Sequence, residues 1–132
     1  MISSRLLTLG AMLLSVAGCV QNAPPPVVSG PPDPNSVTTF TLALQPDSIS
    51  GCILADSSFT RPLTVTVRND TAILLTDGGI HVDMRRIAPD TYSADFQLGL
   101  AWLHMEARLA TRPKRLDVAT HDQGCKWAAT AP

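Results

Sequence analysis

The sequence lacks the short motifs by which many enzymes are recognised. It contains no GxSxG nucleophile elbow, no HExxH metal motif and no glycine-rich phosphate loop. Serines occur in one predicted connection without a neighbouring motif that would activate a hydroxyl, at Ser48, Ser50, Ser57 and Ser58. Spacing alone does not exclude a carboxylate pair of the glycosidase type. We therefore predict that the protein is not an enzyme and needs no cofactor.

A hydrophobic run long enough to cross a membrane is also missing. A spanning helix needs about 20 mostly apolar residues, whereas the apolar run of residues 6–17 is followed at once by Gly18 and Cys19. Arg5 precedes this run and small residues follow it, which is the organisation of a secretory signal peptide. We expect residues 1–18 to be removed from the exported protein.

Val16-Ala17-Gly18-Cys19 resembles the lipobox of bacterial lipoproteins. The resemblance covers only the first 19 residues. It implies that Cys19 becomes the N-terminus and carries a diacylglyceryl thioether, with a further acyl chain such as palmitate on its amino group. Several acyl chains together make a stable membrane anchor. Val20 stands where retention in the inner membrane of enteric bacteria usually favours Asp, so the expected location is the outer membrane, facing the periplasm. The alternative is an ordinary signal peptide that leaves Cys19 as a free thiol.

The chain has no large excess of charge of either sign. Loss of residues 1–18 leaves 132 − 18 = 114 residues with 10 − 1 = 9 basic and 11 acidic side chains, a net charge of −2. This length suits one domain with a single core. We expect no nucleic-acid partner. The short basic groups are interpreted as solvated faces, with phosphate or an acidic partner as the alternative; they are Arg85-Arg86 and the trio Arg112, Lys114 and Arg115.

Cysteine is scarce. Apart from Cys19, only Cys52 and Cys125 are present. Because an exported protein meets an oxidising compartment, we predict that these two residues form a disulfide. Neither belongs to a CxxC pair, so a zinc site is not expected. Two separate buried thiols are the alternative.

Proline gathers in one segment. Six of the eleven prolines lie between residues 20 and 36. We interpret residues 19–36 as the lipidated N-terminus and a Pro-rich tether, and residues 37–132 as a single β-domain. A polyproline II conformation rises about 3.1 Å per residue, so this tether reaches up to roughly 50 Å from a lipid surface.

From Ser36 onward apolar and polar residues alternate with a period of two, which indicates half-buried strands. Turn residues separate these runs at intervals of about ten residues. We predict an all-β fold, a small antiparallel barrel or sandwich of about eight strands. The side chains expected to face inward are Phe40, Leu42 and Leu44; Leu63, Val65 and Val67; Ile80, Val82 and Met84; Tyr92, Ala94, Phe96 and Leu98; and Ala101, Leu103, Met105, Ala107 and Leu109.

Three histidines lie near carboxylates in the sequence. His81 and Asp83 should share one strand face, as should His104 and Glu106, and His121 is next to Asp122. These groups fall on the polar faces of different strands, so we interpret them as ordinary surface residues and predict no metal site.

Trp102 is expected on the polar face of its strand, which makes it a candidate contact residue. We therefore predict a non-catalytic binding or envelope-assembly module whose partner is an envelope protein or peptidoglycan, with contacts through Trp102, Arg85 and Arg86.

Its size, anchor and disulfide are similar to those of the lipoprotein inhibitors of C-type lysozyme, although their SxSGxxY-like stretch is not found and Tyr92 to Asp95 does not match it. The alternatives are an inhibitor of a lysozyme or protease and a carrier of a small apolar ligand.

Overall fold

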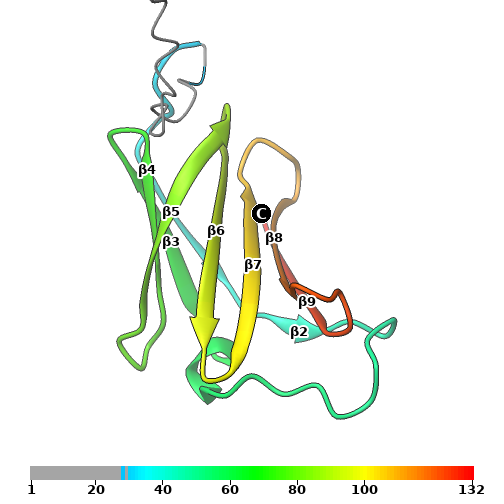
Figure 1. Cartoon of the computed structure of the whole chain (residues 1–132). Coiled ribbons are helices and arrows are strands. Elements are labelled where there is room, and N and C mark those ends of the chain that lie inside the picture. The colour runs from blue at the N-terminus through cyan, green and yellow to red at the C-terminus, as the bar shows by residue number, and fades with distance from the viewer. Residues whose placement is uncertain (1–27, 29) are drawn as a thin grey trace, which may run out of the picture.

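The structure is a computed structural model that describes residue 28 and residues 30–132 (Figure 1). Cys19, the predicted signal peptide and most of the predicted tether lie outside the described residues. The described chain is all-β, as the alternation predicts. Its elements are β1 (Ser36–Phe40), β2 (Ala43–Leu44), the 3-10 helix η1 (Ser57–Thr60), β3 (Leu63–Arg68), β4 (Thr71–Leu75), β5 (His81–Ala88), β6 (Thr91–Leu98), β7 (Ala101–Arg108), β8 (Lys114–Thr120) and β9 (Lys126–Ala131). No helix among these residues is long and apolar enough to cross a membrane.

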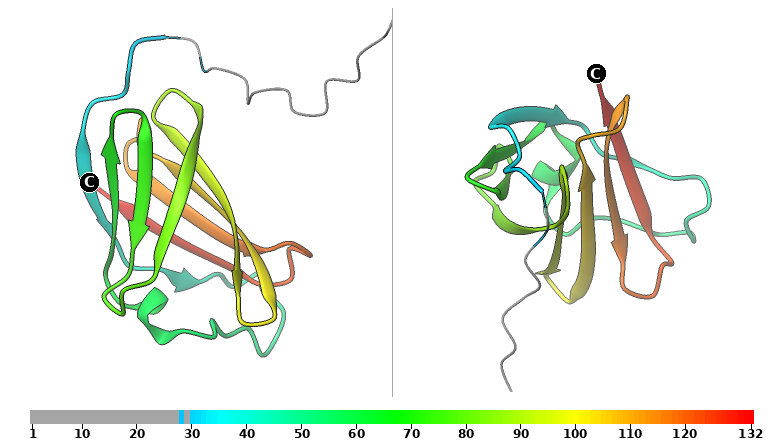
Figure 2. Two further views of the ribbon diagram at one scale, coloured as in Figure 1. Left: turned by 60° about the vertical axis from the view of Figure 1, so that its left-hand side comes forward. Right: turned by 90° about the horizontal axis from the view of Figure 1, so that it is seen from above.

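The nine strands form one antiparallel sheet whose two edges are joined by the start of the domain. From β3 to β9 each strand pairs with the next one in the chain, while β1 pairs with β3 at one edge and β2 pairs with β9 at the other. Only Thr41 and Leu42 separate β1 from β2, so both edges must lie close together. The sheet consequently curls on itself (Figure 2). Of the two predicted architectures, the barrel-like one is therefore present.

The strand count is nine rather than about eight because the first predicted strand is divided. Phe40 and Leu42 are buried as expected, but Leu44 is half exposed. The reason is that β2 lies at the end of the sheet, beside the long loop that leads to η1.

The core contains the alternating side chains that the sequence places inside. Leu103, Met105 and Ala107 of β7 are almost completely buried, and β3 contributes Leu63, Val65 and Val67 in the same way. Burial of such side chains stabilises the fold by about 1.5–3 kcal/mol each. Some of the side chains expected inside are less buried than predicted: Ala101 is exposed, while Ala94, Phe96 and Leu98 are only partly buried.

One end of the curled sheet is closed by η1. The strands β5 and β6 pair only next to the turn that joins them, from Ala88 with Thr91 to Arg85 with Ser93, and then diverge (Figure 1). Phe59 of η1 is fully buried, and its ring centroid lies 6.2 Å from that of Phe96. Asp56 caps η1, because its Oδ1 accepts a hydrogen bond of 2.9 Å from the backbone N–H of Ser58.

The other end is closed by Asp33, which belongs to the segment predicted as tether. The Asp33 side chain is buried, and its carboxylate accepts hydrogen bonds from Arg86 Nη2 at 2.9 Å, the Asp90 backbone N–H at 3.1 Å and the Tyr92 hydroxyl at 2.6 Å. The backbone N–H of Asp33 donates to Asp70 Oδ1 at 2.7 Å. The ordered domain therefore begins a few residues before the expected boundary at residue 37.

This network changes how Arg86 is interpreted. The sequence placed Arg86 among exposed contact residues, yet its side chain is only 9% exposed and is paired with Asp33. Burial by itself raises the pKa of Asp33, but the hydrogen bonds from Tyr92, Asp90 and Arg86 outweigh that effect and lower it below the usual value. Burial and the adjacent Asp33 carboxylate raise the pKa of Tyr92.

Replacement of Asp33 by Asn should lower the free energy of unfolding and make that free energy depend less on pH in the acid range. The variant leaves the Arg86 guanidinium buried without its ionic partner, so we expect a loss of about 3–5 kcal/mol in the free energy of unfolding at pH 7. Because the pKa of Asp33 is lower in the folded chain than its ordinary value of 3.8, its contribution is complete above that value and is lost as the pH falls through the folded pKa. Urea unfolding between pH 7 and pH 2 measures both effects.

Asp47→Asn is the matched control, because Asp47 is an exposed acidic residue that pairs with Lys126 on the surface. It should leave the free energy of unfolding nearly unchanged, because solvent screens an exposed ion pair. An Asp33→Asn protein with the stability and the acid response of the unsubstituted chain would show that the network is not important for folding.

Candidate functional site

The disulfide predicted from the sequence joins the long loop after β2 to the start of β9. Cys52 and Cys125 have an S–S distance of 1.98 Å and a Cα–Cα distance of 5.6 Å. The same loop is held by backbone hydrogen bonding, since Ile49 N–H donates to Gly124 O at 2.8 Å, and by Ser48 Oγ, which accepts from Lys126 N–H at 3.0 Å. Cys125 lies one residue before β9 rather than within the last strand.

The loop held by the disulfide lies against the hairpin turn between β6 and β7. Gly99 in this turn has a φ of +62°, and a Cβ on it would be 3.3 Å from Ala55 Cβ of the loop. Glycine suits this position because it adopts a positive φ without strain and allows the close approach. Between the two segments is a groove of about 380 Å³ whose lining is mostly apolar and includes Ile53, Leu54, Leu98, Leu100, Leu103 and Trp127.

We call residues 49–55 and 98–102 the apolar end. Three of its aliphatic side chains project into solvent: Leu100 is 100% exposed, Ile53 is 85% exposed and Ile49 is 63% exposed. Neither segment contains Asp, Glu, Lys or Arg. Because contiguous exposed apolar surface is typical of contact sites, the apolar end is the candidate functional site of the described chain.

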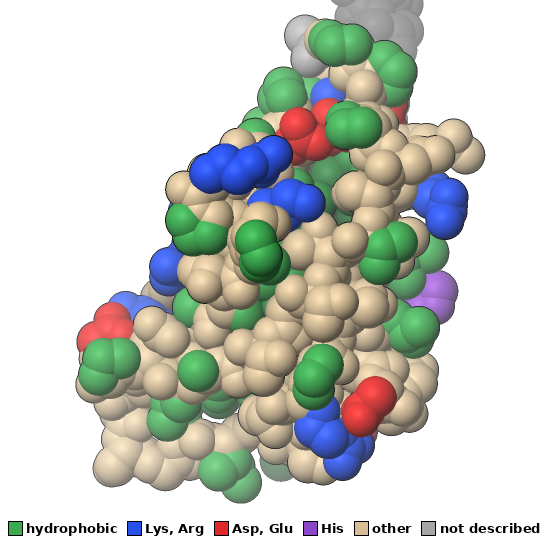
Figure 3. Space-filling view, turned by 180° about the vertical axis from the view of Figure 1, so that it is seen from behind, with side chains coloured by type: hydrophobic (Ala, Val, Ile, Leu, Met, Phe, Trp, Pro, Cys, Tyr) green, Lys and Arg blue, Asp and Glu red, His purple; other side chains and the backbone are tan. Residues whose placement is uncertain are grey.

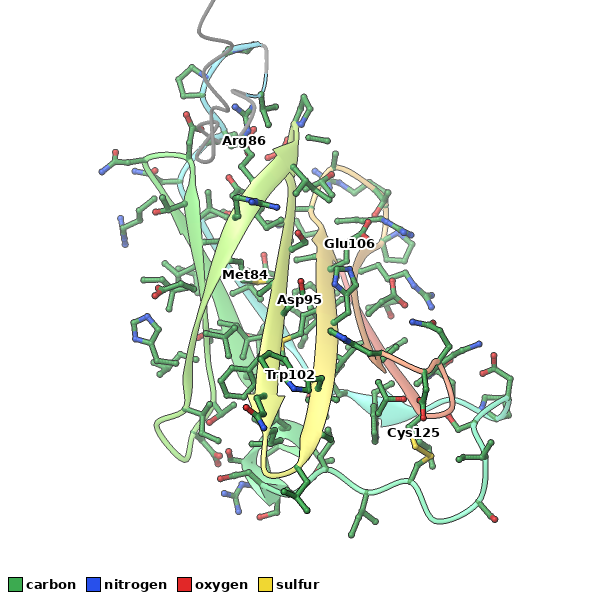
Figure 4. All side chains as sticks on the ribbon, in the orientation of Figure 1. Met84, Arg86, Asp95, Trp102, Glu106 and Cys125 are labelled. Atoms are coloured by element: carbon green, nitrogen blue, oxygen red, sulfur yellow. A yellow bond between two sulfur atoms is a disulfide. The ribbon has the colours of Figure 1, made fainter. Side chains whose placement is uncertain are left out.

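The apolar end lies at the opposite end of the domain from the Asp33 network. Figure 4 shows Arg86 near the point where the chain enters the domain, and Trp102 and Cys125 toward the other end. The described part of the chain therefore has the Asp33 network at one end and its two most exposed aliphatic side chains, Leu100 and Ile53, at the other.

Trp102 is the last residue of the apolar end and lies on the outer face of β7, as its place in the alternation predicts. Its side chain is about half exposed, and its ring centroid lies 6.0 Å from that of His121. The backbone N–H of His121 donates to the Trp102 carbonyl at 3.0 Å, which holds the two residues together.

Two of the histidines converge on a carboxylate that sequence spacing did not reveal. Asp95 Oδ1 lies 3.1 Å from His104 Nδ1 and 3.0 Å from His121 Nε2. The carboxylates expected beside these histidines are not their nearest partners. Glu106 is 4.0 Å from His104, and Asp122 accepts a hydrogen bond from the Thr120 hydroxyl instead. Asp95 and His104 are direct partners across β6 and β7, so only strand register could identify this group.

The cluster of Asp95, His104 and His121 is a surface feature. The hydrogen bond with His104, followed by that with His121, lowers the pKa of Asp95. All three side chains are more than 40% exposed, so solvent screens their charges. Among residues 28 and 30–132, no group of three or more His, Cys, Asp or Glu side chains is arranged to hold a metal ion. The third histidine, His81, is 2.9 Å from Asp83, its expected partner on the same strand face.

The remaining predicted contact residue, Arg85, is exposed on β5 and lines a small polar hollow with Asp83, Ser93 and Asp95. It does not lie beside Arg86 in any shared basic surface, because Arg86 turns inward to Asp33. On the face seen in Figure 3, Lys and Arg side chains are dispersed in small separate groups.

The serine hydroxyls of the predicted connection have structural partners. Ser48 Oγ bonds to the backbone of Lys126, while Ser58 Oγ lies 2.6 Å from Asp56 Oδ1 and 2.8 Å from Thr76 Oγ1. These contacts position the loop and η1.

Comparisons of the chain with protein-family models, with curated proteins and with solved structures found no match. What the protein does is therefore inferred from its own surface.

Substitution of Cys52 and Cys125 by Ser should destabilise the domain and release the loop. The disulfide closes a sequence separation of 73 residues, so its loss should lower the free energy of unfolding by roughly 4 kcal/mol, within a range of 2–5. Urea unfolding of the double variant and of the unsubstituted protein, with and without reductant, measures this difference. If reductant leaves the unsubstituted protein as stable as before, the bond has no such role.

Proposed function

We propose that this chain is a lipid-anchored lipoprotein of the bacterial envelope that faces the periplasm and acts by binding rather than by catalysis. The observation that carries the proposal is the apolar end, where aliphatic side chains and a groove are exposed on a loop that a disulfide holds in place and on the adjacent β6–β7 turn. Loops that are already ordered lose little conformational freedom on binding, which favours affinity.

The position of the apolar end agrees with this function. The predicted lipid at Cys19 and most of the predicted tether precede Asp33 in the sequence, and the apolar end lies at the far end of the domain. An anchor on one side leaves the opposite side available for contact. Trp102 at the border of this surface is of the residue type most enriched among binding hot spots.

The filled core favours surface binding over transport of a ligand inside the barrel. Large side chains occupy the interior, and Phe40, Tyr92 and Met105 are each no more than 1% exposed. A barrel of this size either fills with side chains or keeps one small cavity, and these residues support the first case.

Inhibition of an envelope lysozyme or protease is a second candidate. It is favoured by the loop of residues 48–55, because an inhibitor needs a protruding loop that is held rigidly, and the disulfide at Cys52 supplies such a restraint. Assays of purified protein against lysozymes and envelope proteases test it directly.

A photo-crosslinking residue at position 100 should identify the contact. In the natively anchored protein, Leu100 replaced by such a residue should give an adduct, because its side chain projects fully from the apolar end. Position 87 is the matched control, since Ile87 is an exposed aliphatic residue on β5, away from that surface. Mass spectrometry of the adducts measures the result and identifies the molecule that was captured.

A Cys19→Ala copy tests the anchor in the same cells. We expect it to lose the lipid and to give fewer adducts at position 100. Equal labelling at positions 100 and 87, or labelling at neither, would contradict a role for the apolar end, and an unlipidated Cys19 in the unsubstituted protein would contradict the anchor.

A further inference from the structure

We infer that the apolar end docks on a lipid surface and inserts its aliphatic side chains among the acyl chains. This inference rests on the proposed function and names the partner of the same site. Ile53 and Leu100, the two most exposed of the aliphatic side chains, stand on separate segments that line the groove, and Ile49 is exposed on the same loop as Ile53. A fluid bilayer accommodates such projecting side chains without a surface shaped to match them, and an acyl chain is the occupant whose chemistry fits an apolar groove of about 380 Å³.

The distribution of charge along both loops agrees with shallow insertion. The loop is free of charged residues from Ser48 to Ala55 and is flanked by Asp47 and Asp56. A charged side chain is costly to place in the hydrocarbon region, so these flanking carboxylates would limit the depth of insertion.

Along the outer face of β7 and the turn before it, side chains become more polar with distance from Leu100, which agrees with shallow insertion of the apolar end. From the turn upward, alternate residues are Leu100, Trp102, His104 and Glu106, which pass from aliphatic to aromatic to charged. Alternate residues of a strand are about 6.6 Å apart, so Trp102 stands about one such step behind the aliphatic tip and the Asp95–His104 pair about two. Tryptophan is enriched at the membrane interface, and insertion to about 5–10 Å is the depth typical of interfacial segments.

The length of chain before the domain allows the apolar end to reach the membrane that holds the anchor. Thirteen residues, 20–32, precede Asp33, and in an extended conformation they reach about 40 Å at ~3.1 Å per residue. The eight residues of β7 span only about 26 Å at ~3.3 Å per residue. A domain that is joined to its tether through the contacts of Asp33 can therefore lie along the bilayer or direct its apolar end toward the bilayer.

Quenching of Trp102 by brominated lipid tests this inference. The full anchored chain is reconstituted into phosphatidylcholine vesicles whose acyl chains either carry bromine near the headgroup or do not. Trp102 is half exposed and Trp127 is buried, so a Trp102→Phe copy supplies the background from Trp127. We expect bromine to reduce the Trp102 emission at least twofold. Leu100→Asp and Ile53→Asp should abolish that reduction, and Ile87→Asp should leave it unchanged.

Flotation of the same vesicles separates the two proposals. A protein that floats with the vesicles but shows no bromine quenching, or one whose quenching survives Leu100→Asp, overturns lipid docking and leaves the anchored binding module standing. A protein that does not float overturns both. An adduct at position 100 with another protein or with a second copy of this chain, rather than with lipid, also overturns lipid docking. Equal urea midpoints for the Asp variants and the unsubstituted chain show that the variants are folded.

Discussion

The fold depends on one covalent constraint, the short connection between β1 and β2. These strands bind opposite edges of the sheet, at β3 and at β9, although only Thr41 and Leu42 separate them in the chain. Consecutive Cα atoms are 3.8 Å apart, so the two edges cannot move far from each other. The meander in between has to curl, and the alternating side chains of its inner face then share one core.

A curled sheet still has two open ends, and the chain closes them by different chemistry. At one end a buried polar network centred on Asp33 joins the incoming chain to Arg86 and Tyr92. Its stability depends on the ion pair between Asp33 and Arg86, because a buried charge without a partner is costly. At the other end the Phe59 ring and a disulfide hold the long loop in place and leave aliphatic side chains exposed. The domain thus has a buried polar network at one end and its most exposed aliphatic side chains, Leu100 and Ile53, at the other.

This arrangement gives the proposed function its physical basis. An anchored domain gains a high effective concentration at the membrane, so even a weak second contact becomes important. Three aliphatic side chains bordered by Trp102 could supply such a contact, while the surface cluster of Asp95, His104 and His121 lies further from the tip. Function in this scheme comes from where the exposed residues stand rather than from reactive groups.

The sequence by itself determined the fold class, the strands and the disulfide partners. The fold class and the strands follow from a period of two and from turns such as Asn69-Asp70, which are local properties of the chain. Both of these turn residues adopt the positive φ that such a hairpin requires. Tertiary structure alone decided the rest. Arg86 follows Val82 and Met84 on the inner face of β5, so the alternation places it inward, but its partner Asp33 lies outside the strands and is brought to it only by the fold. The meeting of Asp95 with two histidines depends on register between strands, which the local pattern of the chain does not reveal. The apolar end likewise needed the folded chain, because Ile53 and Leu100 belong to loops that are distant in sequence and come together only when the sheet curls and Cys52 meets Cys125.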